Sequence, residues 1–130
     1  MLSPSQARCL LAVYSLSEVY GRASYKDVCK LLGLSKPTVH NALAALENKG
    51  LIAKKPYGAA ILTEQGESLA RELEARRAHL TLFFSKTFGL SMDQSDLAAL
   101  LLLTGLNEES LQKMGCMSSA APAPEDQDNE

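Results

Sequence analysis

The chain contains no tryptophan, few aromatic residues and only three cysteines. Aromatic residues make up 5% of its 130 positions, while leucine and alanine are abundant, so helices are expected to outweigh sheet. Cys9, Cys29 and Cys116 are odd in number and form no CxxC pair, which argues against a disulfide framework and a zinc ribbon. We expect Cys9 and Cys29 to be reduced thiols among apolar neighbours on helices.

Long apolar runs and catalytic motifs are also missing. The most apolar stretch, residues 97–103, is far shorter than the roughly 20 residues that cross a bilayer. Residues 1–6 show neither a basic start nor an apolar run, so no signal peptide is visible and a cytoplasmic protein is expected. No GxSxG, P-loop, GxGxxG or HExxH pattern occurs, so we do not expect an enzyme.

The small net charge of −2 conceals an uneven distribution. Up to Thr63 the acidic residues are Glu18, Asp27 and Glu47 alone. The basic residues of the same stretch are Arg8, Arg22, Lys26, Lys30, Lys36, Lys49, Lys54 and Lys55. From Glu64 onward acidic residues prevail, and the sequence ends in an acidic tail. This asymmetry predicts a polyanionic partner for the N-terminal half.

Three helices are predicted before residue 50. The first begins after Ser3 or Ser5 and ends near Tyr20, where Gly21 follows. The second spans two to three turns between a Ser24 cap and Gly33, with Val28, Leu31 and Leu32 on its inner face. Such a short helix, followed after a "GLS" turn by another helix, is typical of a helix-turn-helix.

The third helix begins at Ser35, an N-cap residue, and has Pro37 in its first turn. Its apolar residues recur at helical spacing and predict one buried stripe, formed by Val39, Ala42, Leu43 and Leu46. The opposite face is small, polar and lightly charged, whereas a solvated helix face is usually rich in Glu and Lys. A face of this kind suits the major groove of DNA.

A β-hairpin is predicted next, because "LIAKKPYGAAILT" has strand-favouring ends around a basic, turn-prone middle. We expect Lys54, Lys55 and Tyr57 at its tip. Three helices and a hairpin in this order predict a mainly α fold, a winged helix-turn-helix. The residues expected to contact double-stranded DNA are Lys26, Ser35, Lys36, Pro37, Thr38, His40, Asn41, Lys54, Lys55 and Tyr57.

Two further helices are predicted, one from Glu64 to Phe88, closed by Gly89, and an apolar one over residues 91–103; "NEESLQKM" supplies a last turn or helix. Their apolar surface exceeds what a winged helix needs, so we expect a homodimer. The expected dimer contacts are Leu80, Phe83, Phe84, Leu97, Leu100 and Leu101. The predicted regions are a DNA-binding domain (1–64), a C-terminal helical dimerisation element (65–114) and a disordered acidic tail (115–130).

Residues 5–112 resemble the iron- and manganese-dependent repressors related to the diphtheria toxin repressor. The resemblance rests on "DVCKLLGLSKPTVHNALAALENKGLI", on the wing, and on a G-x-x-L-T-x-x-G passage that has one extra residue here: Gly58, Leu62, Thr63 and Gly66. Multiple-antibiotic-resistance-type regulators share a similar wing and helix. The resemblance implies a dimeric winged-helix repressor activated by a divalent metal.

The metal ligands that the resemblance implies are replaced in this chain. The two acidic positions of the first helix correspond to Arg8 and Leu11, and the histidine after the wing to Ala78, next to His79. The remaining ligand positions fall at about Ala98, Leu101 and Leu102. Too few donors remain for a first-row metal, so we expect no metal and no other cofactor. Arg8 would place a fixed positive charge where the family binds a cation.

These observations predict a sequence-specific, metal-independent transcriptional regulator. Two alternatives stay open at this point. One is a protein-interaction module on the same helix-turn-helix scaffold, using the acidic tail. The other is a regulator in which Cys9 or Cys29 responds to oxidation. The sequence does not indicate an effector.

Overall fold

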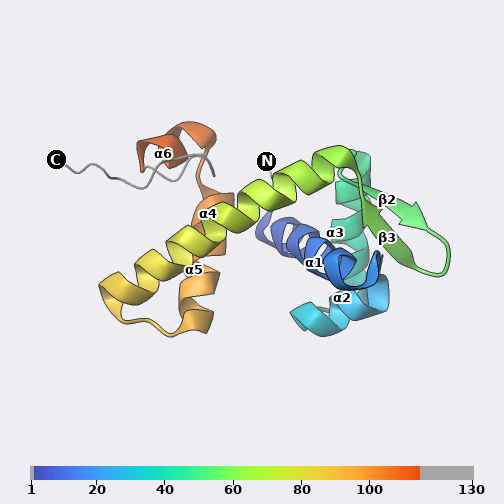
Figure 1. The fold of residues 1–130 in the computed structure, drawn as a ribbon, viewed down its shortest axis with the longest axis horizontal. Helices are drawn as coiled ribbons and strands as arrows, with labels where there is room; N and C mark the ends of the chain where they lie inside the picture. The colour runs from blue at the N-terminus through green and yellow to red at the C-terminus, as the bar shows by residue number, and fades with distance from the viewer. Residues whose placement is uncertain (1, 115–130) are drawn as a thin grey trace. The chain divides into compact units, whose positions relative to one another are not determined.

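The computed structural model describes residues 2–114 (Figure 1). Those residues form two compact units, 2–74 and 75–114, which divide within one long helix. The elements are α1 (Pro4–Tyr20), β1 (Ala23–Ser24), α2 (Tyr25–Leu32), α3 (Lys36–Asn48), β2 (Ile52–Lys55), β3 (Ala59–Leu62), α4 (Glu64–Phe88), α5 (Met92–Gly105) and α6 (Glu108–Lys113). Cys116 and the predicted disordered tail at residues 115–130 lie outside the described residues.

The predicted helix starts and stops are confirmed. Ser3, Ser24 and Ser35 are the N-caps of α1, α2 and α3, and each side chain accepts a hydrogen bond from a backbone N–H of the first turn. Gly21 and Gly33 end α1 and α2 in the left-handed conformation, which glycine adopts without steric cost. The chain therefore specifies a helix-turn-helix with short, well-defined connections.

The core of the first unit is formed by α1, α2, α3 and the sheet. The stripe predicted on α3 is confirmed, because Val39, Ala42, Leu43 and Leu46 are all buried. They pack in one core with the apolar residues of α1, among them Cys9, Leu10 and Val13. One prediction for α2 is wrong: Leu31 is 56% exposed, because this short helix turns only Tyr25 and Val28 fully inward.

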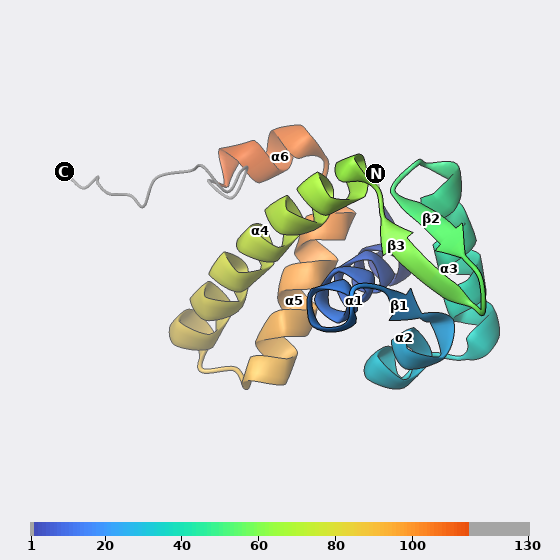
Figure 2. The ribbon, with the colours of Figure 1, turned by 45° about the vertical axis from the view of Figure 1, so that its right-hand side comes forward.

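The sheet has three antiparallel strands in the order β1-β3-β2 (Figure 2). The hairpin was predicted, but β1, with only two residues, was not. Lys54 and Lys55 are paired with Ala60 and Ala59 within the β2–β3 ladder, so they lie on a strand instead of at the tip. The turn itself is formed by residues 56–58, which places Tyr57 at the tip.

Helix α4 begins directly against the hairpin. The Thr63 hydroxyl donates to the Gly50 carbonyl oxygen at 2.7 Å, and the Thr63 N–H donates to the Leu51 carbonyl oxygen at 3.0 Å. Gly66 packs so closely that an added Cβ would lie 1.8 Å from that same Leu51 oxygen. These contacts explain why the first turns of α4 belong to the first unit, which continues to Glu74.

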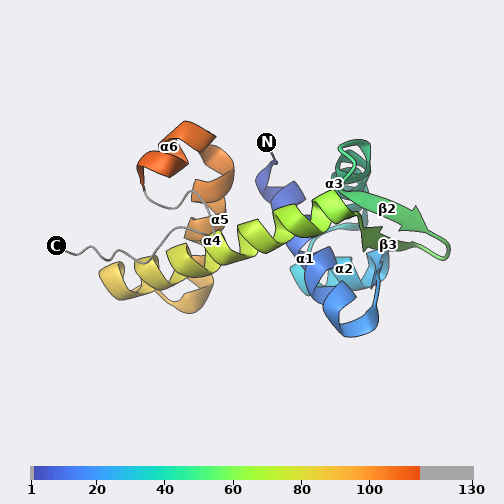
Figure 3. The same ribbon diagram turned by 45° about the horizontal axis from the view of Figure 1, so that its top comes forward.

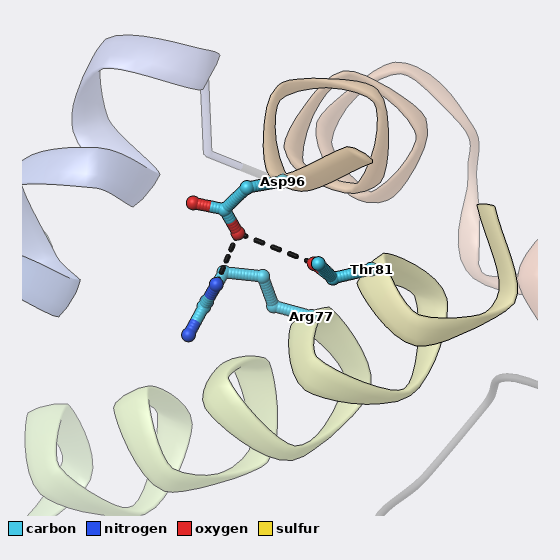
Figure 4. Close-up of polar contacts among 3 residues, drawn as sticks. All are labelled: Arg77, Thr81 and Asp96. Carbon is cyan, nitrogen blue, oxygen red and sulfur yellow. Dashed lines mark hydrogen bonds and ion pairs between the residues drawn. The ribbon is translucent and has the colours of Figure 1, made fainter. Parts of the chain in front are cut away.

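The second unit contains the rest of α4 together with α5 and α6 (Figure 3). Leu80, Ala99, Leu103 and Leu111 form its buried cluster, against which other apolar side chains pack. The Asp96 carboxylate of α5 accepts hydrogen bonds from Arg77 and Thr81 of α4, as Figure 4 shows. Among residues 2–114 no helix is both long and apolar enough to span a membrane.

Candidate nucleic-acid interface

Helix α3 presents the polar face that its sequence predicts. Lys36, His40, Asn41 and Ala44 are all exposed, while the opposite stripe is buried in the core. The N-terminal half of α3 therefore projects outward from the first unit with two hydrogen-bonding side chains and one positive charge. In a helix-turn-helix these first turns of the second helix are the ones that reach base edges.

A hollow of about 520 Å³ lies between the N-terminal turns of α2 and α3 and the hairpin. It brings together six of the predicted DNA-contacting residues: Lys26, Lys36, His40, Lys54, Lys55 and Tyr57. Four lysines around one concave surface create a positive potential that favours a phosphate backbone. Lys54 also lies 3.9 Å from the Glu47 carboxylate, with both side chains largely exposed, so this loose pair does not neutralise the surface.

A second hollow of about 260 Å³ is found on the other side of α3. It is lined by Thr38, Asn41 and Ala42 together with Ser3, Ser5 and Gln6 at the start of α1. The exposed face of α3 is thus a ridge with a hollow on each side. A ridge of this shape fits a duplex groove, because the hollows can receive the backbones on the two edges of the groove.

Ser35 and Thr38, two of the residues predicted to contact DNA, also stabilise the N-terminus of α3, and the sequence indicates this role only for the Ser35 cap. The Ser35 Oγ accepts a hydrogen bond from the Thr38 N–H and lies 2.7 Å from the Thr38 hydroxyl. This cap fixes the first turn of α3 and uses hydrogen-bonding capacity that would otherwise be available to a phosphate. Pro37 lies in the same turn and is exposed.

Tyr25 was missed by sequence reasoning. Its ring is 8% exposed and contacts the His40 ring edge-on, with centroids 4.9 Å apart, and it lines the lysine-rich hollow. Burial raises the pKa of the Tyr25 phenol, and the Glu47 carboxylate raises it further. The side chain is therefore a neutral donor at physiological pH. A buried tyrosine at the first position after a cap has no signature that distinguishes it from a surface residue.

The cysteines are placed as expected for structural thiols. Cys9 is fully buried and Cys29 partly so, and both are free. Burial raises the pKa of the Cys9 thiol to about 11, although neighbouring Arg8 partly opposes this effect and Cys29 adds to it. Because the thiolate is the reactive form, Cys9 is an unreactive thiol near neutral pH.

The predicted dimer residues are not all at the surface of the chain. Leu80 belongs to the buried cluster of the second unit, Leu100 is also buried, and Phe84 is partly buried. Phe83, Leu97 and Leu101 are exposed. Helix α5 is apolar nearly all round in "LAALLLL" and has no polar face there to show which side packs inward, so the pattern alone could not separate Leu100 from Leu97 and Leu101.

Two of the positions that the resemblance relates to metal ligands lie on α1 and make other contacts. The Arg8 guanidinium donates to the Leu32 carbonyl oxygen at 3.2 Å, near the C-terminal end of α2, and Leu11 is buried in the core. Within residues 2–114 no three His, Cys, Asp or Glu side chains gather in a way that could bind a metal ion.

Comparisons with known proteins agree with this architecture. Residues 2–58 match the model of the MarR family. The first unit has a winged-helix regulator fold. Over 56 residues, 43% of this chain, the sequence is 41% identical to two proteins named Transcriptional regulator MntR, from Escherichia coli O6:H1 and Escherichia coli O157:H7. That segment spans 36% of each relative, so the likeness concerns only part of those proteins.

A solved structure shows the same fold over more of the chain. The crystal structure of IdeR from T. acidophilum superposes with a TM-score of 0.64 and 20% sequence identity, covering 82% of this chain and 50% of that one. The resemblance to the metal-dependent regulators is thus supported in both sequence and fold. The similar proteins are regulators, not enzymes, in line with the sequence prediction.

Proposed function

We propose that the protein is a sequence-specific DNA-binding transcriptional regulator that acts as a homodimer in the cytoplasm and needs no bound metal. One observation carries the proposal. The exposed first turns of α3 form a ridge between two hollows, and the hollow toward the hairpin is surrounded by Lys26, Lys36, Lys54 and Lys55. Base-reading side chains and backbone-neutralising charges thus lie side by side.

The chemistry of the ridge assigns different roles to its residues. Asn41 can donate to and accept from an adenine edge, and Lys36 and His40 can donate to guanine acceptors or to phosphates. The lysines of the hairpin supply affinity without sequence choice, because every nucleotide carries the same phosphate. The DNA-binding set from the sequence is retained here, with Tyr25 added as a residue that positions His40.

Binding to DNA selected from a random-sequence library tests this proposal. Asn41→Ala removes a two-hydrogen-bond contact and is expected to weaken binding to the selected duplex by about 5- to 100-fold. Lys36→Ala should also weaken binding and lower the slope of log affinity against log salt by about one. Both side chains are exposed, so neither change should lower the melting temperature.

Lys113→Ala is the matched control, since Lys113 is an exposed lysine of the second unit, 3.8 Å from the Glu109 carboxylate on its own helix. It should leave binding unchanged. Saturating chelator should also leave binding unchanged if no metal is required. Unaltered affinity in both Asn41→Ala and Lys36→Ala would contradict the proposal and favour a protein-interaction module.

A further inference from the structure

A third hollow, of about 330 Å³, lies in the first unit. Its walls come from the end of α1, from β3 and from the first turns of α4. On α1 the lining residues are Tyr14, Ser17 and Glu18, which recur at helical spacing and therefore share one face of the helix. None of its lining residues lines either of the hollows beside α3, so it is a separate feature of the unit.

The charge of this hollow is opposite to that of the lysine-rich one. Two carboxylates line it, Glu18 from α1 and Glu67 from α4, and none of the described residues that line it is basic. Glu18 forms no ion pair within residues 2–114. Glu67 accepts a hydrogen bond from Arg71 at 2.8 Å, but both side chains are more than half exposed, so this pair is weak. The acidic hollow thus attracts cations, whereas the lysine-rich hollow attracts phosphates.

A buried hydroxyl distinguishes the acidic hollow from an ordinary solvated acidic surface. The Ser17 Oγ is buried and has no hydrogen-bond partner among the described residues, although Ser17 lines the hollow. Buried polar side-chain atoms are normally hydrogen-bonded, and a serine within a helix can donate to the carbonyl oxygen four residues earlier. The Ser17 hydroxyl makes no such bond and can therefore accept one from an N–H donor placed in the hollow.

The remaining walls are apolar. Tyr14, Ile61 and Leu62 are partly buried and line the hollow beside the two carboxylates. Aliphatic walls suit methylene groups, and an aromatic ring attracts a cation through its face. Within residues 2–114 no three His, Cys, Asp or Glu side chains gather as metal ligands, so these donors suit an organic cation better than a bare metal ion.

We propose that the acidic hollow binds a small aliphatic ammonium ion. Its N–H groups donate to the Glu18 carboxylate and to the Ser17 Oγ, and its methylene groups pack on Ile61 and Leu62. The hollow has the volume of a small ligand site, since such sites begin at roughly 300 Å³. This proposal does not depend on the DNA-binding function, because a bound cation would leave every residue of the lysine-rich hollow free.

An amide NMR titration of the full chain with 1,4-diaminobutane, without DNA and at constant ionic strength, tests the site. Saturable shift changes are expected for residues 14–21, 61–62 and 67, and none for His40 or Lys55, which lie at the other hollow. The uncharged 1,4-butanediol should cause no saturable change, because it lacks the positive charge. No saturable change with the diamine, or an equal response to Mg²⁺ at the same charge concentration, would overturn the proposal.

Two substitutions separate a defined site from general attraction by negative charge. Glu18→Gln and Ser17→Ala should each raise the dissociation constant of 1,4-diaminobutane by about 3- to 10-fold, since each removes one hydrogen-bonding partner. Ser17→Ala keeps every charge, so an effect of charge alone would leave its affinity unchanged. Asp27→Asn is the matched control, because Asp27 is an exposed acid of α2 that does not line the hollow, and it should bind as the original chain does.

The melting temperature of each variant without ligand shows that the fold is intact. Original affinity in Ser17→Ala, or an equal loss in Asp27→Asn, would refute the proposed site. Neither result would bear on DNA binding, which is measured with Asn41→Ala and Lys36→Ala on a selected duplex. Conversely, a chain that binds no duplex could still bind the diamine, so the two proposals fail independently.

Discussion

The Tyr25 hydroxyl is buried and has no hydrogen-bond partner among residues 2–114. A buried hydroxyl without a partner costs about 1–3 kcal/mol of desolvation free energy. Tyr25→Phe keeps the ring against His40 and removes only this group. It should therefore raise the free energy of unfolding by about 1 kcal/mol in urea denaturation. Tyr25→Ala should instead lower it, since the ring is buried. A destabilised Tyr25→Phe would mean that the hydroxyl is hydrogen-bonded in solution.

Single residues differ in how well the sequence predicts them. Lys36, His40 and Asn41 could be assigned to an outward face because the 3.6-residue period of α3 fixes where each position points. Tyr25 and Leu31 could not, because α2 has only eight residues and the burial of its first and last turns depends on α3 and on the hairpin. Tertiary contacts decide such positions, and a local pattern does not contain them.

The reactivity of the cysteines can be judged in the same way. The sequence left a redox-responsive thiol open, and the structure places Cys9 fully inside the core with a pKa of about 11. At neutral pH its thiolate fraction is therefore very small. Cys29 is partly exposed and is the more accessible of the two. The physical case for a redox response through Cys9 is accordingly weak.

The packing of the first turns of α4 against Leu51 depends on Gly66. A Cβ at position 66 would lie 1.8 Å from the Leu51 carbonyl oxygen, and this neighbour is backbone, which cannot rotate away. Gly66→Ala should therefore separate α4 from the hairpin or distort both. We expect a loss of at least about 2 kcal/mol in the free energy of unfolding of the first unit, measured by thermal or urea denaturation.

A second helical glycine provides the control for this substitution. Gly105 ends α5 and has no atom within 4 Å of an added Cβ. Gly105→Ala should be neutral, or stabilising by up to about 1 kcal/mol, because alanine has the higher helix propensity. If Gly66→Ala were equally harmless, α4 would not pack on Leu51 as described. The G-x-x-L-T-x-x-G passage would then lack the packing role that we assign to its last glycine.

The hairpin shows which features of an element its sequence specifies. Turn-prone residues between two strand-favouring pairs were enough to predict a hairpin. The register was not predictable, since the ladder extends through Lys54 and Lys55 and leaves only three residues in the turn. Strand β1 was missed because two residues carry no alternation, and it forms only through pairing with β3.

At the level of the whole chain, exposed large apolar side chains are unevenly distributed. Among residues 2–114, eight of the twelve belong to the shorter second unit: Leu82, Phe83, Phe88, Leu90, Met92, Leu97, Leu101 and Met114. So much exposed apolar surface on about forty residues is unusual for a monomer and favours a second copy as its partner. The proposed dimer interface thus retains Phe83, Leu97 and Leu101, whereas Leu80 and Leu100 are already buried within the chain.

Because Leu101 is exposed and Leu80 is buried, we expect the same substitution by aspartate to have different effects at these two positions. The original chain should have twice the mass of one 14.0 kDa chain in light scattering. Leu101→Asp should give a folded monomer, because the side chain is 51% exposed, and the control Val19→Asp, at an exposed apolar residue of α1, should remain dimeric. Leu80→Asp should instead unfold the second unit, since it would bury an unpaired charge.

A two-fold dimer places two copies of α3 about 34 Å apart, so the Leu101→Asp monomer should bind a palindromic duplex about 100-fold more weakly or worse. A monomeric original chain that binds such a duplex tightly would contradict the dimer.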